Sequence, residues 1–154
     1  MDAISTIKAR KTYSAAPRRR DGVDVVGLLR SAGLRPTQQR RALAELLFAG
    51  GGRHITAECL REDAMKAGIP VSLATIYNTL NQFTDAGLLR ELAIDANKTY
   101  FDTTTHEHHH YFVEGTDEVF DIPEMELSIT DLPEPPEGME IARVDVVVRL
   151  RPKS

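Results

Sequence analysis

The chain has 154 residues, of which 42% are hydrophobic and 27% are charged. This length allows one ordinary domain or two small ones, and the composition is typical of a soluble globular protein. The sequence shows neither an apolar run near the roughly 18 residues of a membrane span nor a secretory signal, so we expect a cytoplasmic protein without a membrane partner. The single cysteine, Cys59, excludes an internal disulfide and a cysteine-based zinc cluster.

The charge is divided unevenly along the chain. Residues 1–90 carry 14 Lys and Arg against 8 Asp and Glu, a net charge of +6, whereas residues 91–154 carry 5 against 15, a net charge of −10. A basic half favours contact with a polyanion, and nucleic acid is the commonest cytoplasmic polyanion. Chance segregation of charge is the alternative. Residues 1–21 are polar and basic without an apolar period, which predicts a flexible basic tail.

Four helices are predicted in the basic half, from their apolar spacing and their capping residues. They are a helix that starts near Val23 and ends at Gly33, a helix capped by Thr37 that runs to about Phe48, a helix capped by Thr56 over 57–67, and a helix capped by Ser72 over 73–86. The pattern then changes to two short strands, 88–94 and 99–102, joined by a turn. Helices followed by a hairpin predict a winged helix-turn-helix, with 73–86 as the recognition helix.

The acidic half is prone to form strands. We expect strands at 111–113, 119–122 and 141–150, and a short helix within 124–132. A sheet of three short strands is marginal alone, so pairing with a second copy of the chain would stabilise it.

Four of the five histidines lie within five residues, in the run from His106 to His110. On a strand, His106, His108 and His110 share one face, and neighbours two apart can bind one metal ion. Imidazole suits iron, manganese, zinc and haem iron. A solvated polar strand or a pH-responsive cluster is the alternative.

A metal-dependent hydrolase is the competing function, because Asp102 and Glu107 could complete a catalytic metal site beside the histidines. The chain lacks an HExxH helix, a GxSxG elbow and a glycine-rich phosphate loop, so we expect that it is not an enzyme. Cys59 is expected to lie on an apolar helix face rather than to act as a nucleophile. The candidate DNA contacts are Arg35, Thr37, Arg40, Ser72, Thr75, Tyr77 and Asn78.

Several long motifs resemble the ferric uptake regulator family. They are 28–40 (LLRSAGLRPTQQR), 54–58 (HITAE), 71–80 (VSLATIYNTL) and the triplet 108–110, while 137–143 (EGMEIAR) is similar to the family's iron response branch. The resemblance implies a homodimeric transcription regulator of iron and haem genes that binds AT-rich double-stranded DNA. The implied fold class is α+β, with a tail 1–21, an N-terminal winged helix-turn-helix domain 22–102 and a small C-terminal α/β dimerisation and sensing domain 103–154.

The resemblance also implies roles for single residues. Arg35 matches the family's minor-groove residue and Tyr77 its recognition-helix tyrosine, whereas Asn78 replaces a common arginine, which suggests an altered base preference. The family's hinge metal site maps onto His54, Asp102, His108, His110 and Asp121. The positions of the first CxxC pair are occupied by 113–116 (VEGT), so no structural zinc is expected there.

Members of the iron response branch are associated with haem sensing, which here falls on His108, His109 and His110. The implied function is therefore DNA binding controlled by haem or by a divalent metal, iron, manganese or zinc. The alternative within the same family is a regulator that senses manganese, iron or peroxide with a non-haem metal. Neutral imidazole with carboxylate fits Fe(II), Mn(II) and Zn(II) alike, so these alternatives stay open.

Overall fold

The structure is a computed structural model that describes residues 22–154. The predicted basic tail, 1–21, lies outside the described residues. The described chain forms two compact units, 22–105, called here the helical unit, and 106–154, called the sheet unit. No helix in the described part of the chain is long and apolar enough to cross a membrane.

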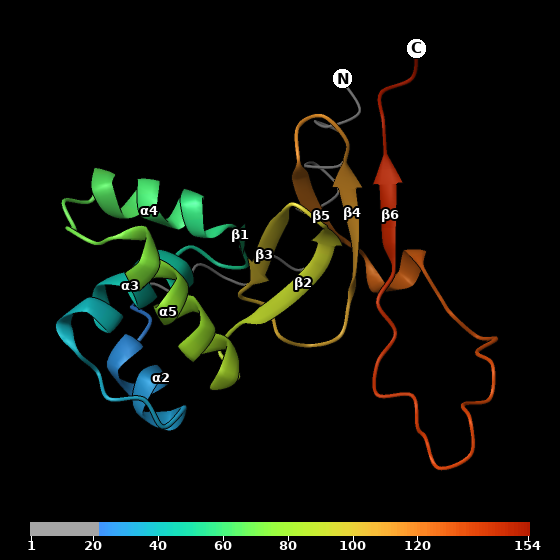
Figure 1. The fold of residues 1–154 in the computed structure, drawn as a ribbon, viewed down its shortest axis with the longest axis horizontal. Coiled ribbons are helices and arrows are strands. Elements are labelled where there is room, and N and C mark those ends of the chain that lie inside the picture. The colour runs from blue at the N-terminus through green and yellow to red at the C-terminus, as the bar shows by residue number, and fades with distance from the viewer. Residues whose placement is uncertain (1–21) are drawn as a thin grey trace. The chain divides into compact units, whose positions relative to one another are not determined.

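The helical unit contains the four predicted helices (Figure 1). They are α2 (Val25–Ser31), α3 (Gln38–Phe48), α4 (Ala57–Lys66) and α5 (Leu73–Asp85). The predicted caps are confirmed, because the hydroxyls of Thr37, Thr56 and Ser72 each accept a hydrogen bond from the backbone N–H three residues later, at 3.2 Å. Gly33 follows α2 with a φ of 77°, the left-handed conformation that ends a helix most readily at glycine.

A three-stranded antiparallel sheet completes the helical unit. Its strands are β1 (His54–Ile55), β2 (Arg90–Asp95) and β3 (Lys98–Asp102), in the order β1-β3-β2. The predicted hairpin is confirmed as β2 and β3, with β2 beginning two residues later than expected. Strand β1 was not predicted, because two residues are too few to show an alternating pattern. Four helices followed by this hairpin have the arrangement of a winged helix-turn-helix.

The core of the helical unit is built from one face of each helix. Its members with no exposed surface are Leu29, Leu43, Ala44, Leu47, Leu60, Ala64, Ile76, Leu80 and Phe83. Phe101 from β3 joins this cluster, so the sheet packs on the same core as the helices. The continuous core holds α5 in a fixed orientation within the unit.

Replacing Thr56 with alanine is expected to destabilise the helical unit by about 1 kcal/mol, because the α4 backbone N–H of Cys59 loses its capping acceptor. Thr56→Ser keeps the hydroxyl and serves as the matched control. Urea denaturation followed by circular dichroism measures both variants, and equal stability of the alanine and serine variants would rule out the cap as a stabilising contact.

The sheet unit contains β4 (His109–Val113), β5 (Glu118–Ile122) and β6 (Val147–Leu150), in the order β5-β4-β6. Strands β4 and β5 are antiparallel, and β6 is parallel to β4. The predicted strand 141–150 is wrong for its first six residues, since only Val147–Leu150 find a partner strand. The predicted helix within 124–132 is wrong except for one 3₁₀ turn, η1 (Glu124–Glu126).

Candidate functional site

Helix α5 has one buried side and one side open to solvent. Ile76, Leu80 and Phe83 are fully buried, whereas Asn78 is exposed and Tyr77 half-buried. Ser72 caps the helix and its hydroxyl also lies 2.9 Å from the hydroxyl of Thr75. The open side therefore offers polar groups from a rigid helix, as recognition helices do.

The Tyr77 hydroxyl on α5 donates a hydrogen bond to the Glu58 carboxylate on α4, at 2.9 Å. This hydrogen bond, with a smaller contribution from desolvation, raises the pKa of the Tyr77 phenol above its ordinary value. The phenol stays protonated at neutral pH, and Glu58 fixes the direction in which it points.

The residues before and at the start of α3 form a second polar surface. Arg35 is exposed, and the Thr37 hydroxyl is used as the cap of α3. The Arg40 guanidinium donates to the backbone carbonyl of Arg35 and to the Gln82 side chain on α5. Of the predicted DNA contacts in this segment, Arg35 and Thr37 are exposed and Arg40 is half-buried, while the Thr37 hydroxyl and the Arg40 guanidinium make contacts within the protein.

One pair of potential metal ligands lies in the helical unit, where β1 and β3 place His54 opposite Asp102. The His54 Nε2 atom lies 3.2 Å from Asp102 Oδ2, and their side chains are only 6% and 1% exposed. The other oxygen, Oδ1, accepts a hydrogen bond from the Thr104 backbone N–H at 2.8 Å, which orients the carboxylate. The unpredicted strand β1 is thus the element that positions His54.

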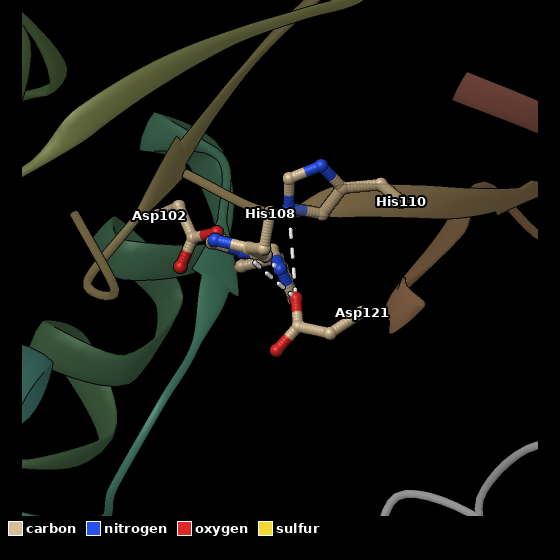
Figure 2. Close-up of side chains that lie close together, drawn as sticks. Asp102, His108, His110 and Asp121 are labelled. Carbon is tan, nitrogen blue, oxygen red and sulfur yellow. Dashed lines mark ion pairs between the residues drawn. The ribbon is translucent and has the colours of Figure 1, made fainter. Parts of the chain in front are cut away.

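A second group of potential ligands lies in the sheet unit. Strands β4 and β5 place His110 opposite Asp121. Asp121 Oδ1 lies 3.2 Å from Nε2 of His108 and 3.5 Å from Nε2 of His110, and Figure 2 shows the carboxylate directed toward both rings. Each of the three residues offers a ligand atom within 4.8 Å of the other two. Both histidines are buried.

The hydrogen-bond partners of the histidine rings distinguish their chemistry. Nδ1 of His108 lies 2.7 Å from the His106 carbonyl oxygen, which can only accept, so in the neutral ring Nδ1 carries the proton and Nε2, which faces Asp121, is the nitrogen that could bind a metal. Nδ1 of His109 instead accepts the Val146 backbone N–H at 3.1 Å, so the proton of its neutral ring lies on Nε2. His108 can therefore ligate through Nε2 without losing its hydrogen bond. His106 itself is exposed.

These donor sets fit a divalent transition metal. They consist of neutral imidazole nitrogens and carboxylate oxygens, which suit Fe(II), Mn(II) and Zn(II).

The expectation that Cys59 lies on an apolar face is wrong. The buried stripe of α4 is Ala57, Leu60 and Ala64, and Cys59 lies beside it and is exposed.

A cavity of about 390 Å³ lies next to the histidine run within the sheet unit. Its wall includes His108, His109 and Arg143, and its apolar lining comes from Ile122, Leu127, Ile129, Leu132 and Ile141. Glu107 and Glu124 also line it, so the wall combines apolar side chains with charged ones.

Comparisons with known proteins agree with this arrangement. Residues 31–148 match the sequence profile of the ferric uptake regulator family. The chain is 35% identical over 85 residues to the ferric uptake regulation protein of Shigella flexneri, which covers 55% of this chain and 57% of that relative. The match thus spans little more than half the length of that curated relative.

Solved structures show a similar fold. The manganese-containing ferric uptake regulator of Pseudomonas aeruginosa is 28% identical with a TM-score of 0.66, and the match covers 86% of this chain and all of that one. The ferric uptake regulator of Vibrio cholerae has a TM-score of 0.65 at 24% identity, over 83% of this chain and 99% of that one. At that identity the Vibrio likeness supports the fold alone.

Proposed function

This chain belongs to the ferric uptake regulator family, and from that membership we propose that it is a DNA-binding transcription regulator whose DNA affinity responds to a divalent metal. Members of the family are transcription regulators and not enzymes, which argues against the hydrolase alternative. The main support for a metal response is the group of His108, His110 and Asp121, because two buried imidazoles and a carboxylate lie close together there.

We propose that the ligands of the helical unit and those of the sheet unit serve one metal ion. The proposal rests on the family resemblance and on ligand number. His54 and Asp102 offer two ligands and the sheet unit offers three, whereas zinc takes four ligands and manganese prefers six. Neither group alone supplies that number of ligands from the protein. A bound metal ion would join ligands from the two units, so metal binding would be coupled to DNA binding. Coupling between two binding sites typically changes an affinity by about 5 to 150-fold.

The proposed DNA surface consists of the Arg35 segment and the open side of α5. Arg35 would enter the minor groove, while Tyr77 and Asn78 would reach base edges in an AT-rich operator. The hydroxyls of Ser72, Thr75 and Thr37 lie at the starts of α5 and α3, where helix N-termini favour contacts with phosphate. The sheet unit is proposed to pair with that of a second copy, so that a homodimer presents two recognition helices.

Haem control is the second candidate, and the cavity beside the histidine run favours it. Its wall contains apolar side chains that a porphyrin could contact, and His108 and His109 supply imidazoles at the same wall. His109 and His110 complete the proposed haem-binding set. A haem response would also support the proposed place of the chain in the iron response branch.

Fluorescence anisotropy of an AT-rich palindromic duplex tests the proposed function. The protein is titrated without metal, with Mn(II) and with haem, and a GC-rich duplex of equal length is the control. Binding that Mn(II) strengthens and haem leaves unchanged supports metal control, and binding that haem lowers supports haem control. Equal affinity for both duplexes in every condition would contradict specific DNA recognition.

Arg35→Ala should weaken binding to both duplexes and reduce the slope of log K against log salt by about 1, because the protein loses one positive charge beside the DNA phosphates.

Asn78→Ala should instead change the ratio of the affinities for the AT-rich and GC-rich duplexes, because asparagine reads adenine edges. Anisotropy at several salt concentrations separates the two effects. Equal losses on both duplexes for Asn78→Ala would remove that residue from the specificity determinants.

A further inference from the structure

The Arg40 side chain connects two separate parts of the helical unit. Its Nη1 atom donates to the backbone carbonyl of Arg35 at 2.9 Å. Its Nε and Nη2 atoms both donate to Oε1 of Gln82, at 3.3 Å and 3.0 Å. Arg40 belongs to α3 and Gln82 to α5, so a single guanidinium bridges the segment before α3 and the recognition helix.

Both ends of this bridge lie next to proposed DNA contacts. The carbonyl that Arg40 binds belongs to Arg35, whose side chain is exposed. Gln82 follows Asn78 by four residues, and residues four apart share one face of a helix. Arg40 therefore contacts the backbone of one proposed DNA-binding element and the proposed DNA-facing side of the other.

We propose that Arg40 is a positioning residue for DNA recognition, which fixes the Arg35 segment relative to α5. This inference rests on the proposed DNA-binding function. Three of the five guanidinium donors are used within the protein. The role depends on the planar, forked shape of the group, because its N–H donors point to two acceptors in different elements at once.

A bridge between two elements and a contact with a DNA phosphate predict different results when Arg40 is replaced by lysine. Lysine keeps the positive charge but carries its three donors on one nitrogen, so it cannot reproduce the two-sided bridge. If Arg40 mainly neutralised a phosphate, Arg40→Lys would retain most of the affinity. If Arg40 positions the two elements, Arg40→Lys behaves like the uncharged Arg40→Met.

The test measures the ratio of affinities for the AT-rich and GC-rich duplexes by anisotropy. Arg40→Lys, Arg40→Met and Gln82→Met are each expected to lower this ratio, on the order of tenfold, and the double variant Arg40→Met with Gln82→Met should lose little more than either single variant. The ratio is the informative readout, because partial unfolding lowers both affinities equally and leaves it unchanged.

Arg41→Met is the matched control. It removes the same charge one position along α3, and within the described part of the chain the Arg41 side chain has no hydrogen bond to Gln82 or to Arg35. The ratio should stay at the wild-type value in this variant, whatever happens to the salt dependence.

Two results would overturn the inference. If Arg40→Lys keeps the wild-type ratio while Arg40→Met weakens binding to both duplexes equally, Arg40 is a phosphate contact. If the single losses at Arg40 and Gln82 add in the double variant, the bridge between them is not the cause. A wild-type protein that does not distinguish the duplexes refutes the proposed function, and this inference with it, whereas unchanged ratios in all variants of a discriminating protein refute only the role of Arg40.

Discussion

His110→Ala is expected to lower the affinity of the chain for Mn(II) by more than about 100-fold. Loss of a residue that merely supports a metal ligand typically costs 10 to 100-fold, and His110 offers a ligand atom itself. Its Nε2 atom lies 3.5 Å from Asp121 Oδ1, and its side chain is 5% exposed, so the nitrogen is held beside that carboxylate. Isothermal titration calorimetry with Mn(II) measures the effect, and the same loss is expected for His108→Ala.

His109→Ala is the control for this experiment, because it removes a neighbouring imidazole whose Nδ1 is occupied by the Val146 N–H. Its Mn(II) affinity should stay within a few-fold of wild type. Comparable losses in all three single variants would show that the histidine run contributes as a general basic cluster. Circular dichroism of each metal-free variant establishes that the fold is retained.

Phe83→Ala is expected to destabilise the helical unit by about 3 to 5 kcal/mol. The ring is fully buried in the core, between α5 and the rest of the unit, and its centroid lies 6.3 Å from that of Phe48. Removing it loses the apolar burial and leaves a cavity that the closely packed neighbours fill only in part. Urea denaturation should show a large shift of the midpoint.

Met65→Ala provides the comparison, because Met65 in α4 is 63% exposed and its truncation should change stability by less than about 0.5 kcal/mol. Stabilities of Phe83→Ala and Met65→Ala that differ by less than about 1 kcal/mol would contradict the described core. Since α5 carries the proposed base contacts, Phe83→Ala should also weaken DNA binding at temperatures where the variant is partly unfolded.

The helices of this chain were predictable because local chemistry marks both of their ends. Thr37, Thr56 and Ser72 cap helices in the structure as their position before an apolar period predicts, and Gly33 ends α2. The hairpin of β2 and β3 was predictable for the same reason, since a polar turn separates two β-prone runs.

Elements that depend on distant partners were not predictable in the same way. The alternation of 141–150 indicates a strand throughout, but only Val147–Leu150 pair with β4. Strand β1 exists because β3 lies beside it. Cys59 shows the limit of periodicity at short range, because a shift of one position on α4 moves a side chain from the buried stripe to the surface.

The residue types that gather at the candidate site were predictable, whereas their hydrogen-bond partners were not. The density of histidines indicates metal chemistry, and the family resemblance adds His54, Asp102 and Asp121. Which ring nitrogen can bind a metal depends on a carbonyl two residues away for His108 and on a backbone N–H 37 residues away for His109. Neither partner leaves a signal in the sequence pattern.

The parallel pairing of β6 with β4 has a consequence for the order in which the sheet unit folds. The hairpin closes between Val113 and Glu118, five residues apart, whereas His110 meets Val147 only after a loop of 37 residues. Closing the longer loop costs about 1.8 kcal/mol more in chain entropy. The hairpin of β4 and β5 that brings His110 and Asp121 together should therefore form early, and β6 should dock last, so these two side chains would be brought together before the sheet is complete.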